Sequence, residues 1–308
     1  MSLSSVLITT IAAIGLLVGL RSAARGTTML YAWGWSCVAA AGIATVEIAI
    51  ALPKGQGLEP DTWKPARYLA AILLFCPLMS ALGSKRPHEQ AWQWIVLSLW
   101  GILALPALEW LAIRRAPALE ISGVRGWFLL LLIGMTALHW LGTRVTVAGV
   151  LLAAAQTCAL WEWLPIGGES VEPWISHLLL LSALAAGTLS LRSSPATRSV
   201  RNEDHSATDS LTAARDQVWR DFRDRFGTLW AFRLMERVNS AASLAGWNAR
   251  LEWNGIRPLA SSPPSAAMKP STLERLEQEN GLNQALWNLL RRFVATDWCQ
   301  SRGWTPPD

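Results

Sequence analysis

The first 191 residues are divided into apolar segments whose lengths approach that of a helix crossing a bilayer. Such a helix needs about 20 apolar residues, because each residue adds about 1.5 Å along a hydrocarbon core about 30 Å thick. Backbone inside lipid must also satisfy its own hydrogen bonds. The fold is therefore expected to be all-α, a polytopic membrane bundle. Its seven segments are 4–20, 29–52, 66–83, 91–113, 124–142, 145–164 and 174–191.

Two of these segments leave the number of spans open between seven and six. The segment 66–83 is short and contains Pro77, and the segment 124–142 is densely apolar only over 127–133. With seven spans, 8 Lys and Arg residues fall on the side of the C-terminal tail and 6 on the other side, whereas six spans without 66–83 give 9 and 5. The excess of basic residues in cytoplasmic loops does not decide between these topologies, but both place the tail in the cytoplasm.

The N-terminal segment has the charge order of an uncleaved span. Residues 6–20 are apolar with no basic residue before them, and Arg21 and Arg25 follow. A cleavable signal peptide has its positive charge first. This order predicts an N-terminus on the outer side and favours seven spans. We expect the protein in a bacterial inner (plasma) membrane, with the lipid bilayer as its first partner.

The C-terminal third has the composition of a soluble protein. Residues 192–308 hold 16 of the 27 basic and 13 of the 22 acidic residues. We therefore divide the chain into a transmembrane domain over 1–191, a polar linker over 192–209 and a small, mainly helical soluble domain over 210–308, on the cytoplasmic side. This domain is the expected site of any cytoplasmic protein partner. Nothing in it indicates nucleic-acid binding, since no group of base-reading or phosphate-binding residues stands apart.

Local patterns predict the helices of this tail. Apolar residues recur every three or four positions from 211 to 241, which predicts one long helix that Gly246 ends. Ser271 and Glu274 fit a capping box, and the short helix that follows should stop near Gly281, before a last helix. Residues 249–253 alternate apolar and polar and predict one short strand or an extended loop, without a partner strand.

Carboxylates in and near the apolar segments are the first candidates for a functional site. With seven spans, segments two, four and six end on the outer side, and each carries an acid near that end. Acids there could take up a proton, bind a cation or receive a basic partner. The alternative is ordinary acids at the membrane interface, because tryptophans neighbour two of them. The candidate residues, with the outer loop and the start of the last segment included, are Glu47, Glu109, Glu162, Glu169, Glu172 and His177.

An aromatic stripe on the long tail helix is the second candidate. Trp219, Phe222, Phe226 and Trp230 share one face, and arginines flank them. The stripe could lie on the inner membrane surface or bind a partner. It could also be the buried face that packs on the last helix, which the interleaved aspartates favour, because they weaken attraction to anionic lipid.

The sequence contains few signs of catalysis. Nucleotide-binding loops, hydrolase motifs and metal-spaced His or Cys sets are absent from it, so we expect no metal and no cofactor. Whether the chain is an enzyme stays open, with a non-enzymatic role favoured. The expected function is an anchoring, assembly or sensing component that acts through the tail. The alternative is a transporter of a proton, cation or small solute that uses the intramembrane carboxylates.

Overall fold

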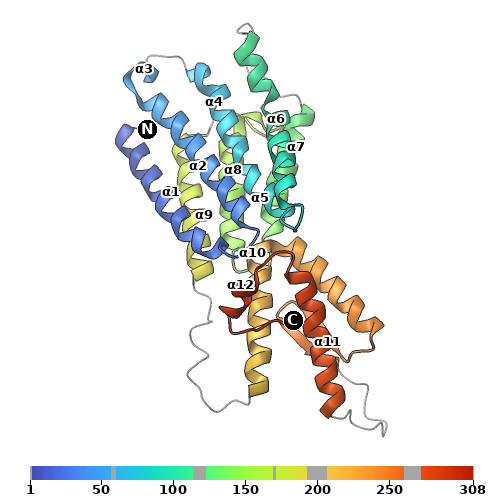
Figure 1. Ribbon diagram of the computed structural model, residues 1–308. Helices are drawn as coiled ribbons and strands as arrows, with labels where there is room; N and C mark the ends of the chain where they lie inside the picture. Colours follow the sequence, from blue (N-terminus) through green and yellow to red (C-terminus); the bar gives the residue numbers. More distant parts are fainter. Residues whose placement is uncertain are drawn as a thin grey trace. The chain divides into compact units, whose positions relative to one another are not determined.

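The computed structural model describes residues 2–56, 60–113, 123–168, 171–192, 207–259 and 272–307, and these are mostly helical (Figure 1). The chain divides into two compact units. The membrane unit comprises Met1–Arg25 and Met29–Ser193, and the tail unit comprises Gly26–Thr28 and Ser194–Asp308.

Helices lie over all seven predicted apolar segments of the membrane unit. Of the described helical stretches, five are long and apolar enough to cross a bilayer: Leu3–Ala24, Leu30–Ala51, Thr62–Leu82, Glu89–Ala112 and Pro173–Arg192. Gly123–His139 is apolar but shorter. The structure is therefore compatible with a membrane protein built from several apolar helices. The elements are α1 (Leu3–Ala24), α2 (Leu30–Ala51), α3 (Pro53–Gln56), α4 (Pro60–Ile72), η1 (Leu73–Phe75), α5 (Cys76–Leu82), α6 (Glu89–Ile113), α7 (Gly123–His139), α8 (Thr146–Leu160), η2 (Trp161–Trp163) and α9 (Pro173–Arg192).

The third segment, which looked doubtful as a span, is the most buried of the five candidates. In the stretch that contains it, 61% of the residues are buried, against 11–28% in the other four. Its helix is interrupted by the 3₁₀ turn η1, and Pro77 then lies in the first turn of α5, where its missing N–H costs no hydrogen bond. The carbonyl of Leu74 in η1 accepts a hydrogen bond of 3.0 Å from Gln156 Nε2 of α8. An interrupted helix is tolerated at membrane depth where protein surrounds it.

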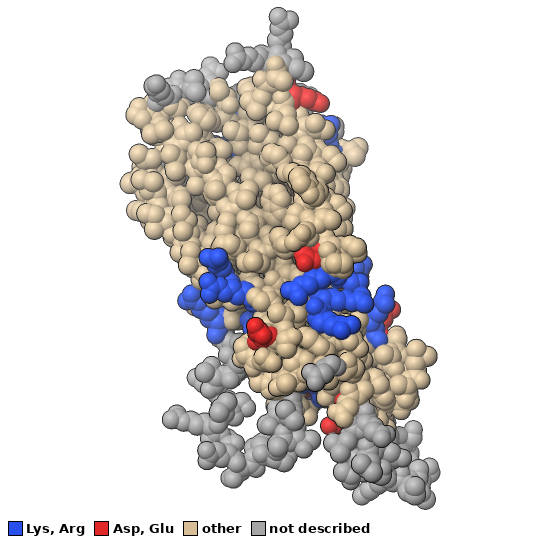
Figure 2. All heavy atoms as spheres, viewed as in Figure 1, with Lys and Arg blue, Asp and Glu red and all other residues tan. Residues whose placement is uncertain are grey.

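Apolar side chains cover the outside of the membrane unit. On α1, Ile8, Ile11 and Val18 are each more than 60% exposed. Figure 2 shows that most of the visible surface over the membrane unit carries no acidic or basic side chain. Such a surface is stable against lipid tails and not against water.

Long-range contacts fix which helix ends lie together. The Arg192 side chain, at the end of α9, lies against Gly19 of α1. Trp35 Nε1 near the start of α2 donates to Gln93 Oε1 near the start of α6, at 2.8 Å. Within the membrane unit, successive long helices therefore alternate in direction (Figure 1). The end of the membrane unit at which α9 finishes is called the exit end. The other end of this unit is called the opposite end.

The tail unit contains α10 (Ala207–Leu244), β1 (Ala249–Glu252), β2 (Gly255–Pro258), α11 (Thr272–Leu290) and α12 (Thr296–Gln300). The predicted long helix is present as α10, but its backbone breaks at Gly227, where φ is 78° and ψ is 176°. Trp247, just beyond α10, donates its backbone N–H to the carbonyl of Ala242 at 2.9 Å.

The prediction that residues 249–253 lack a partner strand is wrong. β1 pairs antiparallel with β2, with Leu251 opposite Ile256, so the two strands form a hairpin. The side chain of Asn239 on α10 holds β1, because it accepts from Leu251 N–H at 2.8 Å and donates to the Leu251 carbonyl at 2.9 Å. The partner was hard to predict because β2 is only four residues long and includes Pro258.

The predicted helix stop near Gly281 is also wrong, since α11 continues to Leu290. The Trp247 ring lies over this glycine, and a Cβ at Gly281 would stand 2.5 Å from it. Gly281 therefore provides room for a packed ring inside a helix, although the Asn-Gly pair reads locally as a helix end.

A short segment from between the first two spans completes the tail unit. Thr27 forms an antiparallel bridge with Val294. The Thr28 N–H donates to the Phe293 carbonyl at 2.9 Å, and the Ala295 N–H donates to the Gly26 carbonyl at 2.8 Å. Gly26 has φ of 74°, and a Cβ there would stand 3.3 Å from Trp298. Three residues of the α1–α2 connection thus belong to the tail fold.

Candidate functional site

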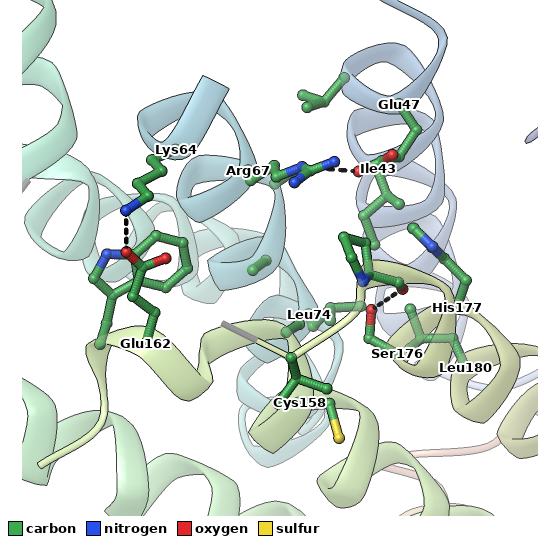
Figure 3. A pocket seen from close by; sticks show the side chains of 17 residues that line it. Ile43, Glu47, Lys64, Arg67, Leu74, Cys158, Glu162, Ser176, His177 and Leu180 are labelled. Carbon is green, nitrogen blue, oxygen red and sulfur yellow. Dashed lines mark hydrogen bonds and ion pairs between the residues drawn. The ribbon is translucent and has the colours of Figure 1, made fainter. Parts of the chain in front are cut away.

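A cavity of about 150 Å³ lies among α2, α4, α8, η2 and α9 in the membrane unit. Charged residues of both signs line it, together with a histidine and apolar side chains (Figure 3). Its charged residues come from the last turns of α2, the first turns of α4 and the turn η2, and its histidine comes from the start of α9. The cavity therefore lies toward the opposite end.

Two ion pairs cross this cavity. Arg67 Nε lies 3.2 Å from Glu47 Oε1 and joins α4 to α2. Lys64 Nζ forms an ion pair with Glu162 Oε1 and joins α4 to η2. Figure 3 shows the two cations leaving α4 toward acids on different sides. Glu162, an acid between two tryptophans, therefore has a basic partner from another helix.

The two ion pairs differ in burial. The Glu47 side chain is only 10% exposed, whereas Arg67 is 36% exposed. Lys64 and Glu162 are 36% and 29% exposed. Exposed pairs contribute about 0–1 kcal/mol, but removing the partner of a buried carboxylate costs more, because the charge loses water without compensation. Arg67 is therefore the basic partner of the more buried of the two acids.

Three further polar side chains line the cavity. His177 lies on α9 in its second turn. Ser176 Oγ donates to the Pro173 carbonyl at 2.8 Å, a hydrogen bond within the first turn of α9. The Trp163 indole Nε1 is buried and, among the described residues, has no hydrogen-bond partner. A buried N–H without a partner is unusual and favours a ligand or ordered water beside it.

The structure brings together three of the six residues of the predicted acid site. Glu47, Glu162 and His177 line the cavity. Glu109 is exposed on α6 and Glu172 is exposed before α9, and neither lines it. Glu169 lies outside the described residues. Of the five candidate residues that the structure describes, three therefore share one site and two lie apart from it.

Sequence reasoning missed the two cations of the site. Lys64 precedes the predicted segment 66–83 and Arg67 lies at its start, but their i, i+3 spacing places both on neighbouring turns of a helix that begins earlier than predicted. A signal was present in the stretch PDTWKPAR, which precedes an apolar run. Which acids these residues meet depends on helix adjacency, which the sequence pattern does not contain.

The aromatic stripe of the tail lies in the core of the tail unit. Trp219, Phe222 and Phe226 are fully buried and Trp230 is 9% exposed. Phe293 contacts three of these rings edge-on, with centroid distances of 5.4 Å to Phe222, 5.3 Å to Phe226 and 4.7 Å to Trp230. These four side chains therefore pack against the chain itself and do not offer a surface for lipid or a partner.

Buried charges accompany this core. Asp221 contacts two guanidinium groups, Arg225 at 3.3 Å and Arg302 at 2.7 Å. The Arg302 guanidinium carbon lies 3.8 Å from the Trp298 ring centroid, a cation–π contact. Burial lowers the pKa of Arg225, and the Asp221 charge opposes that shift. A buried network of this kind specifies one packing arrangement, because each charge needs its partner.

Cys299 is the buried thiol of the tail. Its side chain is fully buried, and burial raises its pKa to about 12, against an opposing effect of Arg302. A thiol with this pKa is protonated at neutral pH and is a poor nucleophile. Among the described residues, no group of three or more His, Cys, Asp or Glu could hold a metal ion.

Comparison with known proteins gives no family for the chain. No protein-family model matches it, and neither curated proteins nor solved structures give a significant match. Its class, a membrane protein with several apolar helices, therefore follows from the helices themselves.

Proposed function

We propose that this is a seven-span membrane protein whose tail unit acts in the cytoplasm as a non-enzymatic assembly or sensing component. The observation that carries the proposal is the membership of Gly26–Thr28 in the tail fold. A tail that was attached to the membrane unit only through the last span would not include backbone from the connection between α1 and α2.

The shared fold constrains the number of spans. Gly26–Thr28 and the rest of the tail unit must lie on one side of the membrane, because they hydrogen-bond to each other. The chain between them then crosses the bilayer an even number of times, and α1 adds one crossing. An odd total satisfies this condition and six does not. The five long apolar helices alone would satisfy it, and so does the proposed total of seven, with α7 and α8 as the shorter spans. Arg21 and Arg25 next to this connection support a cytoplasmic side.

The same connection gives a route for sensing. α1 and α2 leave Gly26–Thr28 in the two directions of the chain. Its hydrogen bonds reach Phe293 and Ala295, and Phe293 is the ring at the centre of the tail core. A shift of α1 against α2 would therefore pull directly on the backbone beside that core. Sensing by this route requires the connection to adopt two arrangements.

Transport is the second candidate, and the cavity is the observation that favours it. Its acids are less suited to carrying a free proton or cation, since Glu47 and Glu162 each have a basic partner. Uptake into vesicles would separate the candidates. Transport through Glu47 predicts uptake that Glu47→Gln abolishes and that Glu109→Gln, at an exposed acid, leaves unchanged.

A disulfide between the two parts of the tail unit tests the first proposal. Thr27 and Val294 are directly opposite in a bridge without mutual backbone hydrogen bonds, where side chains are closest. We expect Thr27→Cys/Val294→Cys, made in a chain without its native cysteines, to cross-link when isolated membranes are oxidised. A protease site introduced within 193–206 then leaves tail and spans joined on a non-reducing gel.

The controls are the two single cysteine variants, which should separate after the same cleavage. The proposal fails if the double variant also separates while both cysteines react with maleimide in detergent. It fails equally if the two cysteines label from opposite sides of sealed membranes.

A further inference from the structure

The opposite-end cavity has the size and composition of a ligand site. Its volume of about 150 Å³ is well above the 10–15 Å³ that one water needs on the same measure. It is comparable with engineered cavities that hold a small organic molecule. Apolar side chains such as Leu74 and Leu180 form part of its wall, and a few polar groups converge on it, as in small-molecule sites generally.

The charges of the cavity balance. Lys64 and Arg67 supply two positive charges, and Glu47 and Glu162 supply two negative charges. Adding a lone anion or a lone cation would leave one charge without compensation in a site with low dielectric. A ligand that carries both signs keeps the balance, since each of its groups can take a place in one of the existing pairs.

The ion pairs leave room for such an exchange. Lys64 and Glu162 are each about one-third exposed, at 36% and 29%, so water reaches this pair. Lys64 and Arg67 lie three residues apart on α4 and extend toward different acids, Lys64 toward Glu162 and Arg67 toward Glu47 (Figure 3). The Trp163 N–H, buried and without a partner among the described residues, adds a donor for an anionic oxygen.

We propose that this cavity binds a small zwitterion at the more exposed ion pair, with its anionic group at Lys64 and the Trp163 indole N–H, and its ammonium at Glu162. The anionic group is a carboxylate or a phosphate. Two sources share this chemistry, a free amino-acid-like solute and the phosphoethanolamine headgroup of a lipid. The binding step makes and breaks no covalent bond. This inference does not depend on the role of the tail.

Thermal unfolding of the full chain in detergent tests the proposal. The probes are glycine, γ-aminobutyrate and O-phosphoethanolamine, which carry both charges, and acetate and methylammonium, which each carry one. A ligand that binds only the folded state raises Tm in a saturable way. We expect a saturable rise with at least one zwitterion and none with acetate or methylammonium, alone or mixed.

Matched variants locate the effect. Glu162→Gln changes one cavity acid that is partly exposed, and we expect at least a tenfold loss of apparent affinity. Glu109→Gln removes an equal charge outside the cavity and should leave binding unchanged. If Glu162→Gln unfolds the chain, Lys64→Met is the second variant, with the same expected loss.

The two sources give different results. A free solute stabilises the protein in lipid-free detergent. A headgroup site instead gives a Tm that is higher in phosphatidylethanolamine nanodiscs than in phosphatidylglycerol nanodiscs, with the difference lost in Glu162→Gln. The proposal is overturned if neither the probes nor phosphatidylethanolamine stabilise the protein, or if the effect persists in both cavity variants. The disulfide test is independent of these results.

Discussion

At the scale of single residues, the tail unit depends on one ring that its sequence pattern did not single out. Phe293 lies after α11 and contacts three aromatic side chains of α10. Its own side chain is 2% exposed. Edge-on aromatic contacts add to the free energy of burying the ring, so this residue joins the two longest helices of the tail.

Removing this ring should destabilise the tail strongly. We expect Phe293→Ala to lower the free energy of unfolding of the tail unit by about 3–5 kcal/mol, because it leaves a cavity among well-packed rings. Pulse proteolysis of the full chain in increasing urea measures it. Phe232→Ala is the control, since Phe232 is 51% exposed and should cost about 1 kcal/mol or less. Equal losses would contradict the assigned core.

The thiol of Cys299 makes a second residue-scale prediction. Its pKa of about 12, against an ordinary 9.0, means roughly a thousand-fold less thiolate near pH 8. Alkylation of the folded protein by iodoacetamide should therefore be slower by at least that factor than in denaturant. Rapid modification of Cys299 in the folded chain, read by mass spectrometry of its peptide, would show that the thiol is accessible.

The raised pKa of Cys299 also determines how the stability of the tail changes with pH. The pKa is raised on folding, so the folded state holds this proton more tightly. The contribution to stability is complete below pH 9 and is lost as pH rises toward 12. Cys299→Ala should flatten the fall of tail stability over that interval.

At the scale of elements, the break in α10 depends on glycine. Gly227 has φ of 78° and ψ of 176°, a combination essentially restricted to glycine. It divides α10 into a part before the break, where Trp219 and Phe222 are buried, and a part that begins near the exposed Leu229. Side chains from both parts contact the same ring, since Phe226 before the break and Trp230 after it both pack against Phe293.

Replacing Gly227 should lower the stability of the tail unit, because other residues are strained in this backbone conformation. We expect Gly227→Ala to destabilise the tail unit by about 1–3 kcal/mol, since a Cβ makes this conformation strained. The midpoint of urea unfolding, followed by protease resistance of the tail, reports the change. Ser240→Ala, at an exposed helical position of α10, should have little effect. A stabilised Gly227→Ala would mean that α10 is continuous in solution.

The third span shows the opposite case, in which surrounding protein permits an irregular helix. Its 3₁₀ turn η1 and Pro77 would be unfavourable in lipid. They are tolerated because Gln156 supplies a hydrogen bond to the Leu74 carbonyl and because neighbouring helices cover the stretch. Hydropathy alone undervalues such a span.

At the scale of the whole molecule, the proposed seven crossings predict which positions face the cell exterior. His88, before α6, and Gly168, after η2, are exposed positions at the exit end and the opposite end. In intact cells, with native cysteines replaced, a membrane-impermeant maleimide should label Gly168→Cys and not His88→Cys. Opening the cells should make His88→Cys reactive. Labelling of both, or of His88→Cys alone, in sealed cells would contradict the topology.

The sequence by itself determined the helical membrane class and the positions of most helices. Runs of about 20 apolar residues are stable in lipid as helices. In the tail, apolar residues at i, i+3 and i+4 spacing predict the helix α10. These are local properties of a chain, so no knowledge of neighbouring elements is needed. The same locality explains the errors at β2 and Gly281, whose conformations depend on partners elsewhere in the tail.

Only the tertiary structure decided which of the noted residues act together. It paired Glu47 with Arg67 and Glu162 with Lys64, and it left Glu109 exposed. It also placed Gly26–Thr28 in the tail fold. Each of these contacts joins residues from different helices or distant parts of the chain. The free energy of such contacts depends on which helices are neighbours, and periodicity and hydropathy carry no information about that.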